Sequence, residues 1–400
     1  MNVLHYTTYS KGGAGLAALR INSALALVNV KSDLEVLYKD ETTESETAHD
    51  FRSSLGFFEN IKLKIRNKNL VGRQQKTIKR LGKQPEMFSF LQSVWDVTRA
   101  KSYDSADIIH FHWVSGFLNY SEFFEKNKKP VLFTLHDHFP FSGGFHYSYG
   151  VEEKAYSEII VIQQQQWKKI IENKNVHFAT PSHDLRKYIE NFGVPASRVR
   201  VIRNPVNSLI FTETHPEKSK EMIGLSNDYK YLLFVSDHID YKRKGFDQIV
   251  ALEPYLPDNV RLLVAGGNPG KFVSFLNRPN VIWLGQIDFE TQMARLYNSS
   301  SLLINPSMDD IYSNTILEAS SCGIPSLCHA HGGIQEVISP GVNGFYFSST
   351  NPQEMANDIV RALNTTWNRD AMSKHVRTGH CLEAVAGQYE NYYRHILQTA

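Results

Sequence analysis

Short apolar runs alternate with longer amphipathic stretches along the whole chain, and this alternation restricts the fold more than any other feature of the sequence. The runs are rich in Val, Ile, Leu and Phe and are typical of buried strands, whereas the stretches between them have helical periodicity. Strands that alternate with helices form βαβ units around a parallel sheet. The sequence therefore predicts an α/β fold throughout.

The apolar runs fall into two series. In the first half of the chain we place strands near residues 2–7, 33–38, 106–111, 130–135, 176–180 and 199–202. The second series begins with YLLFVS (231–236) and continues through RLLVAG, NVIWLG, SLLINP, IPSLCH and NGFYFS. Between them, the proline of RNPVNS (203–208) interrupts the pattern as an interdomain hinge would. We expect two doubly wound, Rossmann-like domains over residues 1–205 and 206–380, followed by a C-terminal helix over residues 381–400.

The composition agrees with a folded protein of two domains. A chain of 400 residues with 42% apolar and 21% charged residues can bury two ordinary cores, and its net charge of +2 gives no case for a nucleic-acid partner. Its cysteines have neither the even number of a disulfide framework nor the spacing of a zinc site. We expect a cytoplasmic protein, because the N-terminus has no cationic leader and no apolar run approaches the roughly 18 residues of a membrane span.

A glycine-rich loop follows the first strand and opens an amphipathic helix. Backbone amides there can approach an anion, so Gly13 and Ala14 are candidate phosphate contacts. Residues 13–18, GAGLAA, also match the dinucleotide fingerprint, with Asp40 near the end of the second strand, which leaves an NAD-dependent dehydrogenase as an alternative. Against it, residues 9–11 separate the glycines from the strand end. A tight turn without a ligand is the third interpretation.

Two further strands of the first domain end in polar clusters. The segment ADIIHFHW carries His110 and His112, and VLFTLHDHFPFSGGFHYS carries His136 and Asp137. Ligands of open α/β sheets bind beyond the carboxyl ends of the strands, so these side chains are candidates for a site, His136 above all. Hydrogen-bonded structural histidines are the alternative for His110 and His112. We expect no metal site, because the spacing of the histidines and the lack of further ligands argue against one.

A cluster of cations lies between the first strand of the second domain and the helix that we expect to begin at Gly245. It consists of Lys242, Arg243 and Lys244. Fixed positive charge at this point would stabilise a phosphate leaving group as its bond to a sugar breaks. A solvated basic turn is the alternative.

Farther along, two carboxylates surround the start of another predicted helix, near Ser313. Asp310 precedes this helix and Glu318 lies one turn inside it. The backbone amides of Asn314 and Thr315 would point at an anion, while Glu318 can accept hydrogen bonds from paired hydroxyls such as those of a ribose. The segment is therefore suited to a nucleotide.

In this order, the segments resemble the GT-B glycosyltransferases of glycosyltransferase family 4, over nearly the whole chain. SKGGAG is similar to the family's glycine-rich loop, RKGF to its phosphate-binding segment, and DIYSNTILEASSCGIP with HGGIQEVISPGVNGF to its Glu-x7-Glu region and the loop after it. DIIHFHW and LHDHFPFSGGFHYS resemble a subgroup that acts in bacterial capsular and exopolysaccharide biosynthesis. The resemblance implies two domains that face each other across a cleft, a last helix that returns to the first domain, and a retaining enzyme that uses a nucleotide-sugar donor.

Carried over residue by residue, the resemblance implies that His136, Lys244 and Asp310 are catalytic. Lys244 would hold the diphosphate and Glu318 the ribose, while Asp310 would face the donor sugar and His136 would lie beside it. The residues implied to bind the donor are Gly13, Ala14, Arg243, Lys244, Asp310, Asn314, Thr315 and Glu318. The candidates on the acceptor side are His112 and Asp137.

Two departures from the family pattern leave the donor base and sugar open. The family often has an arginine six residues before the phosphate lysine, where this chain has His238, so Arg243 or Lys242 would supply the second cation. The first acid of the signature is Asp310 rather than glutamate. No Asp-x-Asp motif occurs, and we expect neither a metal nor another cofactor. A member that binds nucleotide without transfer, and one that transfers the sugar to water, are further alternatives.

The segment from Ile61 to Lys83 has nine basic residues and no acidic one. At an anionic leaflet each would contribute about 1 kcal/mol, which is enough together for reversible docking. A solvated basic helix is an equal alternative. The expected partners are a nucleotide-sugar donor, a glycan or undecaprenyl-linked oligosaccharide acceptor and, through residues 61–83, the inner face of a membrane.

Overall fold

The computed structural model describes residues 1–43, 45–82 and 84–399, without the side chain of Asn173. Lys83 of the predicted basic segment and Ala400 of the predicted last helix lie outside the described residues. The chain divides into two compact units: the first joins Met1–Pro205 to the C-terminal segment from Leu382 onward, and the second is Val206–Cys381. Each unit is built around its own parallel sheet.

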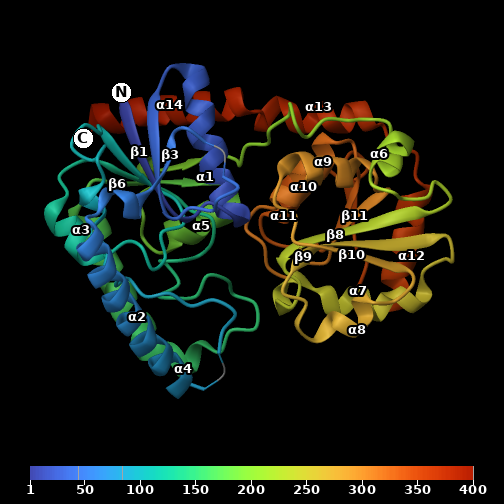
Figure 1. Ribbon diagram of the computed structural model, residues 1–400, viewed down its shortest axis with the longest axis horizontal. Coiled ribbons are helices and arrows are strands. Elements are labelled where there is room, and N and C mark those ends of the chain that lie inside the picture. The colour runs from blue at the N-terminus through green and yellow to red at the C-terminus, as the bar shows by residue number, and fades with distance from the viewer. Residues whose placement is uncertain (44, 83, 400) are drawn as a thin grey trace. The chain divides into compact units, whose positions relative to one another are not determined.

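Within the described residues, the first unit contains a seven-stranded sheet with the order β3-β2-β1-β4-β5-β6-β7 (Figure 1). All neighbouring strands are parallel. The strands are β1 (Asn2–Tyr9), β2 (Lys31–Tyr38), β3 (Ala48–Asp50), β4 (Ile108–Phe111), β5 (Val131–Thr134), β6 (Val176–Thr180) and β7 (Val199–Val201). The α-helices of this unit are α1 (Gly12–Ala24), α2 (Phe57–Arg80), α3 (Tyr120–Lys126), α4 (Glu153–Asn173), α5 (His183–Asn191) and α14 (Leu382–Thr399).

The last helix, α14, belongs to the core of the first unit although it follows the second unit in the sequence. Its buried residues are spaced three or four apart, which places them on one face, and they include Tyr389, Tyr393 and Ile396. This face packs in one apolar cluster with Val3 of β1 and Ile21 of α1. The helix therefore packs beside α1 on the sheet, and the hydroxyls of Tyr393 and Tyr389 reach His110 and Thr134 at the central strands.

The second unit contains a six-stranded parallel sheet, counted over the described residues, with the order β10-β9-β8-β11-β12-β13. The strands are β8 (Lys230–His238), β9 (Val260–Gly267), β10 (Val281–Gly285), β11 (Leu302–Asn305), β12 (Ser326–Cys328) and β13 (Gly344–Tyr346). The α-helices are α6 (Pro216–Met222), α7 (Phe246–Leu252), α8 (Val273–Leu276), α9 (Glu290–Asn298), α10 (Asn314–Ser321), α11 (Ile334–Val337), α12 (Pro352–Asn364) and α13 (Arg369–His380).

The two parallel sheets confirm the predicted α/β class with two Rossmann-like domains. Each sheet reverses its strand order at one place, between β1 and β4 in the first unit and between β8 and β11 in the second. Ligands of doubly wound folds bind at such switch points, beyond the carboxyl ends of the strands. The strand β3 is absent from the predicted set, because it is a three-residue edge strand without an apolar run.

The helix α2 covers most of the predicted basic segment and is largely exposed. It extends over 24 residues, and Leu63 is its buried residue. No helix in the described part of the chain is long and apolar enough to cross a membrane.

Candidate functional site

In the second unit, the turn after β8 lies against the loop after β11. The turn is a short 3₁₀ segment, Lys242–Lys244, and α7 begins at Phe246, one residue later than predicted. Gly245 between them has a φ of 72°, and a Cβ there would collide with the carbonyl oxygen of Pro306. The missing side chain at Gly245 thus allows the basic turn to approach the loop that leads to Asp310.

Lys244 and Asp310 form an ion pair at this contact. The Nζ of Lys244 lies 3.2 Å from Oδ2 of Asp310, and the two side chains are 23% and 16% exposed. Burial lowers the pKa of Lys244, and the negative charge of Asp310 offsets this only in part. Burial also opposes the ionisation of Asp310, but Lys244 and Arg243 outweigh it and hold the pKa of Asp310 below its ordinary value. The structure therefore brings together two of the three residues predicted to be catalytic.

Arg243 is the second cation beside this pair. It is buried, and its Nη1 donates to the carbonyl oxygen of Asp309 at 3.4 Å. The ring of His238 instead stacks on that of Tyr241, with centroids 4.3 Å apart, and Lys242 is exposed. Of the two replacements predicted for the family's missing arginine, the geometry favours Arg243.

Glu318 lies in α10, which begins after Ser313 as predicted. It is 6% exposed, and its Oε2 accepts a hydrogen bond from the hydroxyl of Tyr297 at 2.9 Å. The side chain of the N-cap residue Ser313 makes no capping hydrogen bond, and its hydroxyl instead lies 3.0 Å from that of Thr315. The roles assigned to Glu318, Asn314 and Thr315 stay predictions.

In the first unit, the glycine-rich segment is the first turn of a helix rather than a loop. The helix α1 begins at Gly12, so Gly13 and Ala14 lie inside it, directly beyond the carboxyl end of β1. This corrects the predicted loop, since only Ser10 and Lys11 lie between the end of β1 and Gly12. Asp40, the acid that a dinucleotide fingerprint would need for a ribose, pairs with Lys11, whose Nζ lies 3.0 Å away.

Three imidazoles form a row at the switch point of the first sheet, and we call His5, His112 and His136 the imidazole row. The Nδ1 of His5 lies 2.9 Å from Nε2 of His112, and the Nδ1 of His112 lies 3.3 Å from Nε2 of His136. Burial lowers the pKa of His5 to about 3 and that of His136 to about 4, and holds the pKa of His112 well below its ordinary value. The row is therefore neutral near neutral pH.

His110 lies beside the row and fits the structural alternative. Its Nδ1 lies 2.7 Å from the hydroxyl of Tyr393 in α14, and its Nε2 lies 2.8 Å from the hydroxyl of Thr134. Nitrogen atoms of His5, His110 and His112 lie within 4.8 Å of one another, a grouping that could hold a metal ion. His5 of β1 thus adds a third nitrogen ligand that the spacing of the motif did not show, and the absence of a metal stays a prediction.

Asp137 braces the segment after β5. Its Oδ2 accepts a hydrogen bond from Nε1 of Trp113 at 2.8 Å and lies 2.6 Å from Nδ1 of His146, while its Oδ1 accepts one from the amide of Phe139 at 2.9 Å. Although burial opposes its ionisation, His146 and these donors hold the pKa of Asp137 below its ordinary value. The predicted contact of Asp137 with an acceptor stays a prediction.

Two family models match most of the chain between them. Residues 56–208 match the model described as Glycosyltransferase Family 4, and residues 229–365 match the model described as Glycosyl transferases group 1. The chain is a GT-B glycosyltransferase of the family 4 type. The dehydrogenase alternative is not supported.

This glycosyltransferase is also similar to individual proteins. It is 26% identical over 278 residues to an uncharacterised glycosyltransferase of Methanocaldococcus jannaschii, covering 65% of this chain and 67% of the relative. It is 23% identical over 298 residues to the D-inositol 3-phosphate glycosyltransferase of Thermobispora bispora, covering 70% of this chain and 67% of the relative.

Solved structures show the same fold. Anabaena HepE in complex with UDP and glucose matches with a TM-score of 0.71 and 15% identity, over 98% of this chain and 99% of the other. Sucrose-phosphate synthase of Thermosynechococcus elongatus matches with a TM-score of 0.70 and 18% identity, over 100% of both chains. These matches confirm the GT-B fold of the glycosyltransferase.

The motifs of the sequence do not single out His5 and His146, although both contact predicted site residues. One signal was present for His5, because a histidine in the middle of a predicted buried strand needs a polar partner. His146 gave a weaker signal, since only its place in the resembling segment SGGFHYS marked it. His5 meets His112, 107 residues later, whereas His146 meets Asp137 nine residues before it and Ser89 57 residues before it.

Proposed function

We propose that this glycosyltransferase moves a sugar from a nucleotide diphosphate donor to a hydroxyl of a glycan or lipid-linked glycan, with retention of configuration. The observation that carries the proposal is the partly buried Lys244–Asp310 ion pair at the switch point of the second sheet. A cation held there can exchange Asp310 for the diphosphate of a donor without a large rearrangement. Support comes from HepE, whose solved structures hold UDP, glucose and UDP-glucose.

The proposed chemistry uses positive charge to stabilise the leaving group. When the bond between C1 of the sugar and the phosphate oxygen breaks, the diphosphate takes the electron pair and gains negative charge. Lys244, Arg243 and the amides at the start of α10 would stabilise that charge. The acceptor oxygen forms its new bond to C1 on the same face, and its proton passes to the departing phosphate oxygen. The chain's own cations make a divalent metal unnecessary in this scheme.

The remaining site residues bind and orient. Glu318 would accept hydrogen bonds from the ribose hydroxyls, and Asp310, released from Lys244, would face the donor sugar. In the first unit, Gly13 and Ala14 would offer backbone amides to phosphate oxygens, because α1 begins there. His136 would lie beside the transferred sugar, with His112 behind it.

The donor is tested by screening a panel of nucleotide sugars with two readouts, the melting temperature and the hydrolysis of the donor in the absence of acceptor. A bound donor raises the melting temperature of the native protein. Hydrolysis without acceptor and transfer with a glycan acceptor would support a transferase, whereas binding without any turnover would support the nucleotide-binding alternative. If no nucleotide sugar shifts the melting temperature, the proposal is wrong.

We further propose that the enzyme acts in polysaccharide biosynthesis while docked on the inner leaflet of a membrane through α2. Phe57 and Phe58 at its start are 74% and 85% exposed. Phe58, Ile65 and Lys76 share one face, because Ile65 lies seven residues after Phe58 and Lys76 lies eleven residues after Ile65. An exposed face with apolar side chains in one half and lysines in the other is suited to an anionic lipid surface.

Sedimentation with liposomes tests this docking. Anionic liposomes at low salt should carry the protein down, and neutral liposomes should not. Charge reversal at Lys76, Lys79 and Arg80 should release it, because attraction to the surface scales with the basic charge. Equal sedimentation with both kinds of liposome would contradict the proposal.

A further inference from the structure

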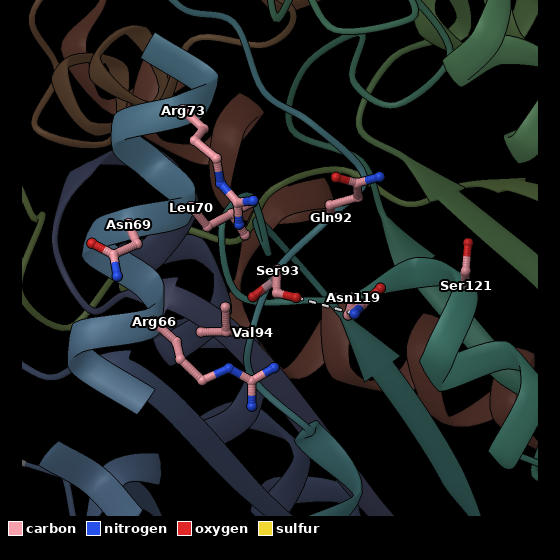
Figure 2. A pocket seen from close by; sticks show the side chains of 9 residues that line it. All are labelled: Arg66, Asn69, Leu70, Arg73, Gln92, Ser93, Val94, Asn119 and Ser121. Carbon is pink, nitrogen blue, oxygen red and sulfur yellow. Dashed lines mark hydrogen bonds between the residues drawn. The ribbon is translucent and has the colours of Figure 1, made fainter. Parts of the chain in front are cut away.

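A pocket of about 430 Å³ lies beside α2 in the first unit (Figure 2), and its lining includes no residue of the imidazole row or of the glycine-rich turn. One wall is the side of α2 that carries Arg66 and Arg73, and the opposite wall is formed by the segment 92–94 and the start of α3. The pocket is lined by Arg66, Asn69, Leu70, Arg73, Gln92, Ser93, Val94, Asn119 and Ser121. Leu70 and Val94 are the two apolar side chains among these nine, so the lining is mostly polar.

Two guanidinium groups point into this pocket without a carboxylate to neutralise them. Arg66 and Arg73 are seven residues apart and share one side of α2, and Figure 2 shows both side chains reaching over the segment 92–94. Neither forms an ion pair with any described residue. Glu122 follows Ser121 of the opposite wall in the sequence, but its Oε1 lies 2.7 Å from Nζ of Lys126 and is paired with it. The two guanidinium groups are therefore available to an anion.

We propose that this pocket binds a phosphate-bearing group, which under the proposed function belongs to the acceptor. A guanidinium offers two parallel N–H donors that match the oxygens of a phosphate, and two guanidiniums can hold a diphosphate or a phosphate with its ester substituent. The amides of Asn69 and Gln92 and the hydroxyl of Ser121 supply further hydrogen bonds. The volume exceeds what a single inorganic phosphate fills, which leaves room for the group that carries it.

The pocket is connected to the acceptor side of the first unit by the two segments that form its far wall. The side-chain amide of Asn119 donates to the carbonyl oxygen of Ser93 at 3.0 Å, which ties these segments together (Figure 2). The first of them begins near Ser89, whose hydroxyl lies 2.8 Å from Nε2 of His146. The second leaves the imidazole row at His112. A phosphate in the pocket would therefore be held on the same unit as His136.

The test is a calorimetric titration with inorganic pyrophosphate. The wild type is expected to bind at two sites, this pocket and the donor site around Lys244. The variant Arg66→Gln/Arg73→Gln should lose binding in the pocket, with an affinity about tenfold lower for each arginine, while Lys244→Ala should lose binding at the donor site alone. If Lys244→Ala binds like the wild type, the proposed donor site is wrong. If the arginine variant binds like the wild type, the pocket is wrong.

The matched control is Lys64→Gln/Lys68→Gln, which removes the same charge from the opposite side of α2. This control should bind pyrophosphate like the wild type. If it weakens binding as much as the arginine variant does, or if the arginine variant binds normally, the pocket is not a phosphate site and the proposal is overturned. Since all four side chains are exposed, none of these changes should prevent folding.

A second arm identifies the source of the phosphate. Vesicles of phosphatidylcholine with and without phosphatidylglycerol are sedimented with the same variants. A larger loss of binding for the arginine variant than for the lysine control would support a lipid-borne phosphate in the pocket. Equal losses, together with lost pyrophosphate binding in the arginine variant alone, would support a soluble phosphate ester.

Discussion

Each unit carries candidate site residues at the switch point of its sheet, and we call each set the half-site of its unit. The two half-sites differ in charge. At the β8/β11 switch point the second unit presents a partly buried ion pair, Lys244 with Asp310. At the β1/β4 switch point the first unit presents neutral imidazoles that are joined by hydrogen bonds. Under the proposed function the two sets of residues would have different tasks, because formal charge is needed where the charge of the ligand changes, and orientation is sufficient where it does not.

The largest effect should come from removing the charge of the second half-site. Lys244→Ala deletes a cation that interacts more strongly with the transition state than with the bound donor, so kcat should fall by about a hundredfold, which corresponds to about 3 kcal/mol, and the donor KM should rise. Steady-state kinetics measure both values. The exposed neighbour provides the control, and Lys242→Ala should change kcat by less than about threefold.

The neutral half-site depends on which imidazole nitrogens carry protons. A neutral imidazole donates from one nitrogen and accepts at the other. The Nε2 of His5 is buried and has no hydrogen-bond partner among the described residues. An unpaired N–H is rarer in folded proteins than an unpaired acceptor, so we expect the proton on Nδ1 of His5. Each imidazole then donates to the next, and His136 presents its Nδ1–H as a donor.

Breaking the row should therefore have the second largest effect. His112→Phe keeps the size of the ring but removes both hydrogen bonds, so His136 loses its orientation and its single tautomer. We expect kcat to fall roughly tenfold. Nitrogen-15 NMR of the histidine rings should show the Nδ1–H form of His136 in the wild type and a mixture in the variant. A loss of melting temperature with unchanged kcat and tautomer would reduce His112 to a packing role.

A smaller effect on the kinetics is expected from a substitution at Glu318. This substitution separates residues that bind the donor from residues that act in the chemical step within the second half-site. Glu318→Gln keeps the shape but weakens a charge-assisted bond to hydroxyls that do not change during the reaction. The donor KM should rise about fivefold, and more than kcat falls. Should the variant keep its nucleotide affinity while losing turnover, Glu318 would be an acid or base and the ribose assignment would be abandoned.

The sequence predicts the sheets better than the contacts between half-site residues. Apolar runs located the strands of both sheets except β3, because burial on both faces of a parallel sheet leaves a strong signal, whereas the sequence of β3, Ala-His-Asp, contains no apolar run. The pairing of Lys244 with Asp310, 66 residues apart, depends on the close approach of Gly245 to Pro306, which no local pattern encodes. The same holds for His5, which meets His112 only because β1 and β4 are neighbours.

The charge of Lys244 can also be tested without deleting it. Because burial lowers the pKa of Lys244, the wild-type kcat/KM should fall as the pH rises toward that lowered pKa and the amine loses its proton. Lys244→Arg keeps the charge at all accessible pH values, so this alkaline decline should disappear. At neutral pH the variant should lose only about threefold, through altered geometry. An unchanged pH profile would show that another group causes the decline.

Chelation should have the smallest effect on the kinetics. It decides whether the charged half-site acts with the chain's own cations or with a metal ion. If Lys244 and its neighbours supply the positive charge for the leaving diphosphate, EDTA should leave kcat and KM unchanged, and added magnesium or manganese should not raise them. Should EDTA abolish transfer, the location of the metal can be tested, because the nitrogen atoms of His5, His110 and His112 are close enough together to hold one. His5→Gln would then reproduce the loss if the metal lies in the first unit, and the neutral description of that half-site would be replaced by a metal site. If His5→Gln had no effect, the metal would accompany the diphosphate, and stabilisation by Lys244 alone would be the part of the account that fails.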